Sequence, residues 1–333
     1  MKVTLVFRRK NPRFFSIESV FSRILAAWPS TDKPGTVELP DMGVSLRNLR
    51  FLRNYQSRNA SDLWHMTGDS TYVSVVLPGR RTIISIHDCG FFVRNRNLKT
   101  RIIKWILLDI PVRHAAYIHA ISEKTKEEIV RLTRCKPEKI RVIPNPVSPL
   151  LEYTPRIFRQ DVSRLLFIGL TENKNFTRAC EAMAGIPCHL VIIGKPDAGQ
   201  KSVLRRLNIS HDIRHGLTEA EMAQEYENAD IVYFPSLYEG FGLPVIEGFR
   251  AGRAVLTSDI SPMREISEGA ACLVDPLQPA SIREGLLRLI RESTYREALI
   301  RRGLVVAERY SPEARAAEFS AFYHEVYETI CAE

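Results

Sequence analysis

The chain lacks any run of about 18 uncharged apolar residues, the length that a membrane-spanning helix requires. Its N-terminal segment Met1–Phe7 is too short for the apolar core of a signal peptide, and we expect it to form a strand. The six cysteines are scattered without a C-x-x-C pair, which favours neither a disulfide framework nor a zinc site. These absences predict a cytoplasmic protein with reduced thiols.

Acidic residues are scarce in the first half of the 333-residue chain. Residues 1–150 contain 26 Lys and Arg against 12 Asp and Glu, whereas residues 151–333 contain 21 against 26. This asymmetry indicates two domains with different partners. A basic half suits an anionic membrane, an acidic acceptor or nucleic acid. We expect no nucleic-acid partner, because the chain has no helix-turn-helix, zinc or RNP-like pattern.

The second half alternates short apolar runs with helix-like segments. Such runs are typical of buried parallel strands, so residues 160–310 are predicted to form a doubly wound α/β domain. The expected strands are Leu165–Ile168, Leu190–Ile193, Ile231–Phe234 and Ala254–Thr257, and the expected helices are 175–183, 219–228, 281–292 and 311–330.

The first half, residues 1–150, is predicted to form a second α/β domain. Its expected strands are Val3–Phe7, Leu63–Met66, Val73–Leu77, Thr82–Ile86, Ala116–Ala120 and Arg141–Ile143. Repeated prolines from Pro144 to Pro155 indicate the linker, because proline breaks both helix and strand ladders. We expect the C-terminal helix, within 311–333, to pack back on this first domain.

The most informative segment begins at Tyr233 and is Y-F-P-S-L-Y-E-G-F-G-L-P-V-I-E. Pro244 marks a helix start, because proline at the first helical position needs no amide partner. Glu239 then lies in the preceding loop and Glu247 in the first helical turn. Two carboxylates around a helix N-terminus suit a polyhydroxyl ligand joined to a phosphate. The alternatives are that Glu247 only complements the helix dipole and that Glu239 is a solvated loop charge.

This segment resembles the retaining glycosyltransferases of family 4, the "glycosyl transferases group 1". Further matching pieces are F-I-G-L-T-E-N-K-N from Phe167, S-D-I-S-P-M-R-E-I from Ser258, V-D-P from Val274, and in the first half I-S-I-H-D from Ile84, A-I-S-E-K-T-K-E-E-I from Ala120 and I-R-V-I-P-N-P-V from Ile140. The resemblance implies an α/β fold of the GT-B type, in which two Rossmann-like doubly wound domains face each other across a cleft. The first would bind the acceptor and the second the nucleotide-sugar.

The resemblance also implies roles for individual residues. Glu247 would bind the ribose hydroxyls, and Glu239 the transferred sugar near its reacting carbon. Lys174 would neutralise the diphosphate, and His87 would contact the sugar. Backbone around the diphosphate and sugar would come from Gly169, Phe241, Gly242 and Leu243. The alternatives are an ordinary exposed lysine at position 174 and, at position 87, a histidine that only caps a strand.

Two positions depart from the family pattern. Leu170 and Asn173 stand where many members have arginine, so one expected diphosphate cation is missing locally. Arg178, Lys195 or an arginine of the first domain is a candidate to replace it. The usual Gly-Gly turn after the first strand is also absent, and residues 13–18 read R-F-F-S-I-E instead.

The implied reaction moves a hexose from a nucleotide-sugar to a saccharide or lipid-diphosphate-linked hydroxyl, in cell-surface polysaccharide or lipopolysaccharide synthesis. Mannose from GDP-mannose is the first expectation and a UDP-hexose the second. No D-x-D pair follows a strand, so we expect a metal-independent enzyme without a cofactor. The alternatives are a GT-B-fold sugar-nucleotide epimerase and a catalytically inactive partner that binds nucleotide-sugar.

Basic residues are mixed with aromatic and other apolar residues between positions 91 and 108. Arg94, Arg96, Lys99, Arg101 and Lys104 are interspersed with apolar side chains that include Phe91 and Trp105. This pattern is typical of an interfacial helix that binds anionic lipid, and it predicts peripheral association with the inner face of the cell membrane. A core helix with a solvated basic face is the alternative.

Overall fold

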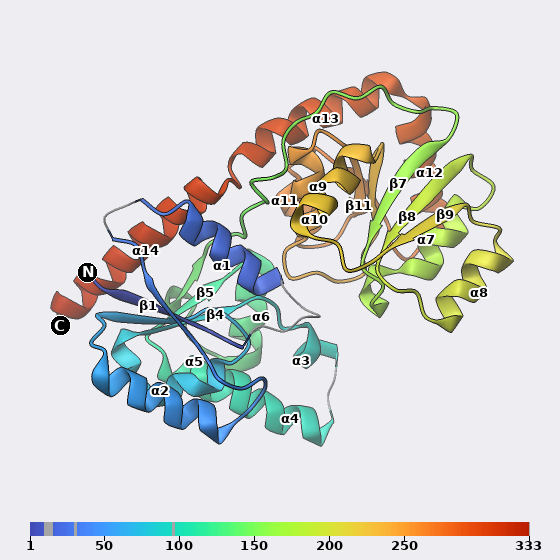
Figure 1. Ribbon diagram of the computed structural model, residues 1–333. Coiled ribbons are helices and arrows are strands. Elements are labelled where there is room, and N and C mark those ends of the chain that lie inside the picture. The colour runs from blue at the N-terminus through green and yellow to red at the C-terminus, as the bar shows by residue number, and fades with distance from the viewer. Residues whose placement is uncertain (10–15, 30–31, 95–96, 333) are drawn as a thin grey trace. The chain divides into compact units, whose positions relative to one another are not determined.

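The computed structural model describes residues 1–9, 16–29, 32–94 and 97–332, which form two compact units (Figure 1). One unit comprises Met1–Pro146 and Pro312–Glu333, and the other comprises Val147–Ser311. The C-terminal helix therefore belongs to the first unit although it follows the second in sequence. Of the sequence features discussed above, residues 13–15 of the segment after the first strand and Arg96 lie outside the described residues.

The first unit is built on a six-stranded sheet in which every neighbouring pair is parallel. Its strands, in spatial order, are β2 (Gly35–Glu38), β1 (Val3–Phe7), β3 (Leu63–Met66), β4 (Thr82–Ile86), β5 (Tyr117–Ala120) and β6 (Ile140–Val142). Its helices are α1 (Ser16–Ala26), α2 (Leu46–Arg58), α3 (Gly90–Arg94), α4 (Leu98–Lys104), α5 (Ile110–His114), α6 (Glu123–Thr133) and α14 (Pro312–Ala332), with short 3₁₀ turns η1 (Thr71–Val76), η2 (Gly79–Arg81) and η4 (Pro137–Lys139) and a π-helical turn η3 (Trp105–Asp109).

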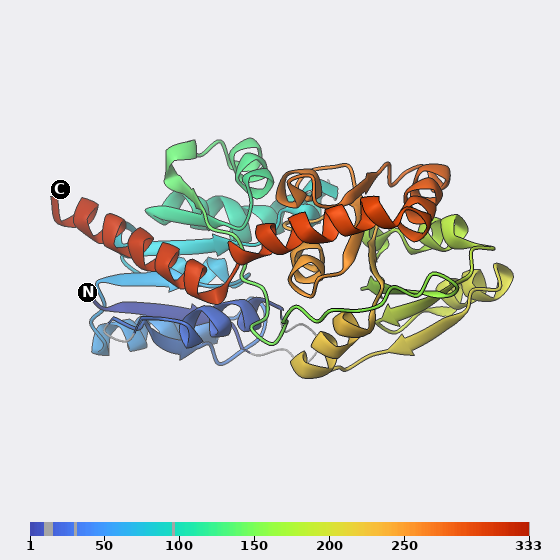
Figure 2. The same ribbon diagram turned by 90° about the horizontal axis from the view of Figure 1, so that it is seen from above.

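Two apolar layers cover the faces of this sheet. One layer includes Trp64, Ile84 and Ile118 and packs under α2, α5 and α6. The other includes Phe21 of α1 and Phe319 of α14, whose rings lie 5.5 Å apart. Helix α14 thus runs beside α1 and completes the core of the first unit (Figure 2).

The second unit is also a parallel six-stranded sheet with helices on both faces (Figure 1). Its strands, in spatial order, are β12 (Cys272–Val274), β11 (Ala254–Ser258), β10 (Ile231–Phe234), β7 (Ser163–Ile168), β8 (Cys188–Ile193) and β9 (His211–Arg214). Its helices are α7 (Phe176–Met183), α8 (Ala198–Arg206), α9 (Glu219–Asn228), α10 (Leu243–Arg250), α11 (Met263–Ser267), α12 (Pro279–Arg291) and α13 (Ser293–Glu308), with the 3₁₀ turn η5 (Glu172–Lys174).

Most of the predicted strands are confirmed, but Val73–Leu77 is wrong as a strand. Residues 71–76 form the turn η1, which packs against α5 and β4. Its apolar residues have the composition of a buried strand, and a short apolar run does not distinguish strand from helix. The location decides it: β3 and β4 are parallel neighbours, so the chain between them has to cross over a face of the sheet.

Three strands were missed: β2, β9 and β12. Each lies at an edge of its sheet, where half of the ladder is unpaired and the strand is short. The segments G-T-V-E and H-D-I-R carry too few apolar residues to indicate a strand by themselves.

The predicted interfacial segment is not one continuous helix. It is divided into α3 and a second helix in which α4 continues directly into the π-helical turn η3. The Asn97 side chain caps α4 by accepting from the Thr100 amide at 2.8 Å. Within the part of the chain that the structure describes, no helix is both long and apolar enough to cross a bilayer.

Candidate functional site

The strand order of the second unit reverses between β7 and β10. Strands β8 and β9 follow β7 on one side of it in the sheet, and β10, β11 and β12 then follow on its other side. Open parallel sheets bind ligands beyond the carboxyl ends of their strands at such a reversal, because the two following loops separate there. Gly169 follows β7 and Pro235 follows β10, so the loops that carry Lys174 and Glu239 begin at this point.

Lys174 and Glu239 meet at the reversal. The Lys174 Nζ atom lies 2.6 Å from Glu239 Oε1 and 4.6 Å from the centroid of the Phe234 ring. Both side chains are more than four-fifths buried, so the alternatives of an exposed lysine and a solvated glutamate are wrong. Gly169 has a φ of +82°, and a Cβ there would lie 3.0 Å from Cε of Lys174. Glycine therefore provides both the turn and the space for the lysine.

Asn173 holds the loop that carries Glu239. Its Nδ2 donates to the carbonyl of Tyr238 at 2.9 Å and to Glu239 Oε1 at 3.5 Å, while its own carbonyl accepts from the Leu237 amide at 2.7 Å. At the position where the resemblance implies an arginine, the neutral Asn173 side chain and its backbone carbonyl thus join the two loops. The sequence showed the substitution but not this role.

Asn175 ties three loops together. It has a left-handed backbone with a φ of 63°, which asparagine tolerates better than most residues. Its buried Nδ2 donates to the carbonyls of Pro235 at 3.0 Å and Pro276 at 2.7 Å. The loops after β7, β10 and β12 are thereby held at one edge of the sheet.

Glu247 lies deeper than the sequence suggested. Helix α10 begins at Leu243, so Glu247 is its fifth residue, and the expectation of a carboxylate in the first turn is wrong. The helix begins one residue before the proline, so Pro244 occupies its second position. Glu247 is buried, and its Oε2 accepts a hydrogen bond from the Tyr226 hydroxyl at 2.7 Å. A role limited to complementing the helix dipole does not fit this depth, because the dipole effect falls off beyond the first turn.

The residues between the two glutamates shape the start of α10. Gly242 has a φ of +96°, and a Cβ at this position would lie 3.1 Å from Ile266. The Phe241 side chain is buried and its ring lies 5.8 Å from that of Tyr310. Leu243 is the first helical residue. The first amides of a helix have no intrahelical acceptor, so this turn offers donors to an anion.

The candidate replacements for the missing cation differ in location. Leu170 lies against Gly194 and packs on the core of the second unit. Arg178 donates from Nη1 to Asn175 Oδ1 at 3.2 Å, which places it next to the residue that follows Lys174. Lys195 is exposed beyond the end of β8. Arg178 is therefore the better-placed of these two cations.

His87 lies in the first unit, directly after β4. Its Nε2 is 2.8 Å from the carbonyl of Thr67, which only accepts, so Nε2 carries the proton and Nδ1 is an acceptor in the neutral ring. Burial lowers the pKa of His87 below its ordinary value, although the Thr67 carbonyl and Asp88 act in the opposite direction. The hydrogen bond to Thr67 holds the ring in one tautomer. The alternative interpretation of His87, a histidine that caps a strand end, predicts such a bond.

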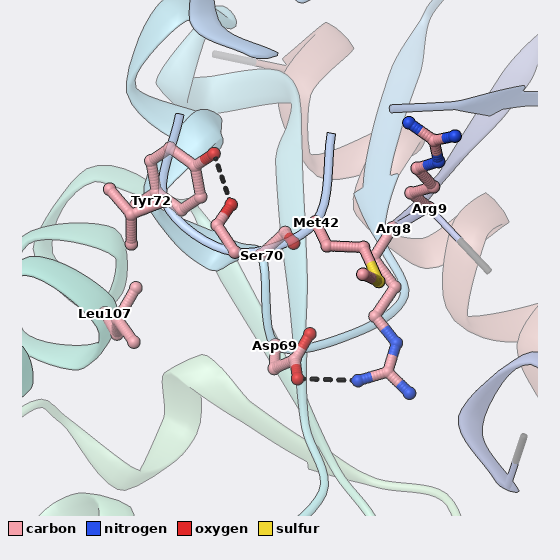
Figure 3. A pocket seen from close by; sticks show the side chains of 9 residues that line it. Arg8, Arg9, Met42, Asp69, Ser70, Tyr72 and Leu107 are labelled. Atoms are coloured by element: carbon pink, nitrogen blue, oxygen red, sulfur yellow. Dashed lines mark hydrogen bonds and ion pairs between the residues drawn. The ribbon is translucent and has the colours of Figure 1, made fainter. Parts of the chain in front are cut away.

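A cavity of about 180 Å³ opens at the corresponding reversal of the first sheet, between β1 and β3 (Figure 3). Arg8 follows β1 and donates from Nη1 to Asp69 Oδ2, beyond β3, at 2.6 Å, and from Nε to Glu18 at 2.5 Å. Arg9, Ser70, Met42, Tyr72 and Leu107 complete most of the lining. Each unit thus has an ion pair across its reversal, and nothing in the sequence indicated Arg8 and Asp69.

No group of three or more His, Cys, Asp or Glu side chains is arranged to hold a metal ion among residues 1–9, 16–29, 32–94 and 97–332. The described cysteines are all free thiols.

Comparisons with known families match both halves of the chain. A model described as "Glycosyl transferases group 1" matches residues 158–305, and one described as "Glycosyltransferase Family 4" matches residues 2–149. The chain therefore belongs to the family 4 glycosyltransferases, which confirms the resemblance found in the sequence.

Individual relatives are distant. The chain is 30% identical over 224 residues to an uncharacterized glycosyltransferase of Methanocaldococcus jannaschii, a match covering 60% of this chain and 57% of that one. It is 24% identical to the O-antigen chain mannosyltransferase B of Escherichia coli, covering 71% and 69%. It is 29% identical to the phosphatidyl-myo-inositol mannosyltransferase of Mycobacterium tuberculosis, covering 42% and 38%. The match thus spans little more than half of the first relative's length.

Solved structures are similar over nearly the whole chain. The sucrose-phosphate synthase of Thermosynechococcus elongatus has a TM-score of 0.80 at 16% identity, covering 98% of this chain and 99% of that one. HepE of Anabaena, solved with UDP and glucose, has a TM-score of 0.78 at 14% identity, covering 98% and 100%. WaaG, a glycosyltransferase involved in lipopolysaccharide biosynthesis, has a TM-score of 0.74 at 13% identity, and the match covers 97% of this chain and 99% of that one. At such identities the likeness shows the fold, and the predicted GT-B fold class is confirmed.

Proposed function

We propose that this protein transfers a hexose from a nucleotide-sugar to a hydroxyl group of a saccharide or lipid-diphosphate-linked acceptor, with retention of anomeric configuration. The observation that carries the proposal is the Lys174–Glu239 pair at the strand reversal of the second unit. A cation and a carboxylate at one ligand-binding edge match a donor that joins a diphosphate to a sugar.

The relatives favour a particular donor. Two of them are named mannosyltransferases, one for O-antigen chains and one for phosphatidyl-myo-inositol. We therefore place mannose from GDP-mannose first. HepE was solved with UDP and glucose, so a UDP-hexose is second. The same relatives favour a role in cell-surface polysaccharide or lipopolysaccharide synthesis.

In the proposed donor site, different residues bind the ribose, the diphosphate and the sugar. Glu247 accepts hydrogen bonds from the ribose hydroxyls, and the amides at Phe241, Gly242 and Leu243 bind the diphosphate and sugar. Glu239 binds sugar hydroxyls near the reacting carbon. Gly169 leaves room for Lys174, which moves its contact from Glu239 to the diphosphate when the donor arrives.

The proposed chemistry needs positive charge where the bond breaks. As the sugar–phosphate bond lengthens, negative charge grows on the leaving diphosphate and positive charge on the sugar ring. Lys174 and the amides of α10 stabilise the former, and Glu239 the latter. The acceptor hydroxyl attacks from the same face, and its proton passes to the departing phosphate oxygen. We propose that no metal or cofactor takes part, which activity after exhaustive treatment with EDTA tests.

The first unit is proposed to bind the acceptor. Its cavity is lined by carboxylate, guanidinium and aromatic groups, which together recognise saccharide hydroxyls (Figure 3). Arg8 pairs with Asp69 inside this lining and with Glu18 beside it. His87 follows β4 at the same edge of the sheet and offers Nδ1 to a sugar hydroxyl.

We also propose that the protein works at the cytoplasmic face of a membrane. Leu98, Ile102 and Trp105 are exposed at intervals of four and three residues, which places them on one side of α4 and its extension. Lys99 and Arg101 supply positive charge beside them. An apolar stripe bordered by cations suits the interface of an anionic bilayer.

A thermal-shift panel tests the donor assignment. GDP-mannose, UDP-glucose, ADP-glucose and dTDP-glucose are each added in excess, and the bound donor raises Tm in proportion to RT ln(1 + [L]/Kd). We expect GDP-mannose or UDP-glucose to give the largest rise. If no nucleotide-sugar shifts Tm, the transferase proposal fails. Stabilisation without transfer to any acceptor would instead support an inactive binding partner.

A further inference from the structure

The Tyr226 hydroxyl contacts the proposed ribose-binding carboxylate from a different element. Tyr226 lies near the end of α9, is buried, and donates to Glu247 Oε2 at 2.7 Å. The start of α9 is held by a capping box in which Thr218 and Glu221 bond to each other's amides. The tyrosine therefore approaches the carboxylate from a helix whose N-terminus is held in place.

Burial makes this contact important. A carboxylate without hydrogen-bond donors is strongly disfavoured away from water, and an O–H···O⁻ bond is among the stronger ones in proteins. A carboxylate also rotates about its last torsion, whose preferences are broad. A donor aimed at one oxygen narrows that rotation and so orients the other oxygen before any ligand binds.

We infer that Tyr226 is a positioning residue for donor recognition: its hydroxyl holds the Glu247 carboxylate in the orientation that accepts hydrogen bonds from the ribose. The inference rests on the proposed function of Glu247. It adds a residue outside the E-x7-E segment, 21 positions before Glu247. Preorganisation of this kind raises affinity because the bound geometry is already present in the free protein.

Tyr233 provides a matched control. It is also buried in the second unit, and its hydroxyl donates to the carbonyl of Ala179 at 2.9 Å. It lies on β10 and belongs to no part of the proposed donor site. Removing either hydroxyl deletes a buried hydrogen bond, so Tyr226→Phe and Tyr233→Phe are both expected to lower Tm, and Tyr226→Phe by at least as much because its acceptor is a carboxylate.

The test is calorimetric titration of the full chain with UDP and GDP and with their 2′,3′-dideoxy forms. With whichever ribonucleotide binds, we expect Tyr226→Phe to raise Kd roughly ten- to hundredfold. This is the range for losing a hydrogen bond between the ribose and the charged Glu247 carboxylate, which is no longer correctly oriented. Tyr233→Phe leaves Kd unchanged. With the dideoxy form, wild type and Tyr226→Phe bind equally, because the hydroxyls that Glu247 recognises are gone.

Each other result has one meaning. If Tyr226→Phe weakens binding of the ribonucleotide and of its dideoxy form equally, Tyr226 has only a structural role and the inference is overturned. If Glu247→Gln weakens ribonucleotide binding but Tyr226→Phe does not, the inference fails and the proposed function stands. If wild type binds neither UDP nor GDP, the inference fails together with the proposed GDP or UDP donor, and the thermal-shift panel then decides whether the transferase proposal stands.

Discussion

The Nδ1 atom of His65 lies 2.6 Å from the hydroxyl of Tyr323, a residue 258 positions further along the chain. The other ring nitrogen of His65 is 2.8 Å from Ser85 Oγ. Ser85 Oγ is 2.7 Å from His119 Nδ1, and His119 Nε2 is 2.8 Å from the carbonyl of Ile143. A buried chain of hydrogen bonds thus joins α14 to three strands of the first sheet.

Only one arrangement of protons satisfies this chain. The Ile143 carbonyl accepts, so His119 donates from Nε2 and accepts at Nδ1 from Ser85. Ser85 then accepts from His65 Nε2, and His65 Nδ1 accepts from Tyr323. Both rings are neutral with the proton on Nε2. Burial lowers the pKa of His65 well below its ordinary value and that of His119 to about 3.

These histidines predict that acid weakens the first unit. In the unfolded chain they take up protons below a pH of about 6.5, whereas in the folded chain they stay neutral to far lower pH. The stability they contribute is complete above that pH and falls as pH drops toward 3. The slope is at most about 1.4 kcal/mol per pH unit for each ring.

Urea titrations at pH 7 and pH 5 measure this effect. Trp28, Trp64 and Trp105 all lie in the first unit, so tryptophan fluorescence reports its unfolding selectively. His119→Gln should reduce the loss of stability between the two pH values, whereas the exposed His324→Gln should not. An unchanged pH dependence in His119→Gln would show that its ring does not carry the effect.

Glu239 and Glu247 should separate in function. A nucleoside diphosphate has a ribose but no transferred sugar. Glu247→Ala is therefore expected to weaken its binding, roughly tenfold or more, since hydrogen bonds to charged groups contribute about 1.5–3 kcal/mol. Glu239→Ala should keep that affinity and reduce kcat. Equal loss of nucleotide affinity in both variants would contradict the division of roles.

Arg178 should supply the second cation for the diphosphate. Arg178→Ala is expected to weaken binding of a nucleoside diphosphate more than of the monophosphate, because only the former places charge beside Lys174. Lys195→Ala, which removes an exposed cation beyond β8, is the matched control. If Lys195→Ala has the larger effect, the assignment passes to Lys195.

Asp69 should affect transfer but not donor binding. Its side chain is exposed, so Asp69→Ala is expected to cost little stability. We expect slow donor hydrolysis to continue while transfer to acceptor falls at least tenfold, measured as sugar released against sugar transferred. Asp161→Ala, an exposed change in the second unit, should alter neither. Parallel loss of hydrolysis and transfer would place Asp69 in the donor site.

The exposed stripe of α4 should govern membrane binding. Flotation with phosphatidylglycerol vesicles is expected to recover the protein at low salt and to lose it at high salt, because screening removes the electrostatic part. Ile102→Ser with Trp105→Ser should reduce recovery. Val305→Ser, an exposed apolar residue of the second unit, should not. No flotation at low salt would rule out this surface as a membrane anchor.

Much of the fold was predictable because buried parallel strands consist almost wholly of apolar residues. Val3–Phe7, Leu63–Met66, Thr82–Ile86 and Ile231–Phe234 were predicted with the bounds that the structure shows. The edge strands β2, β9 and β12 and the turn η1 were not predicted. An edge strand depends on its single paired neighbour, and η1 depends on the crossover between β3 and β4, and these neighbours are distant in sequence.

The sequence by itself determined the family and the two carboxylates around α10, because the E-x7-E spacing and its glycines are local properties of the chain. Only the tertiary structure decided what surrounds them. It paired Lys174 with Glu239, made Asn173 a clamp, and brought the Tyr226 hydroxyl to Glu247. These contacts join loops and helices across strand crossovers, and their partners are chosen by the packing of the sheet, which no short segment encodes.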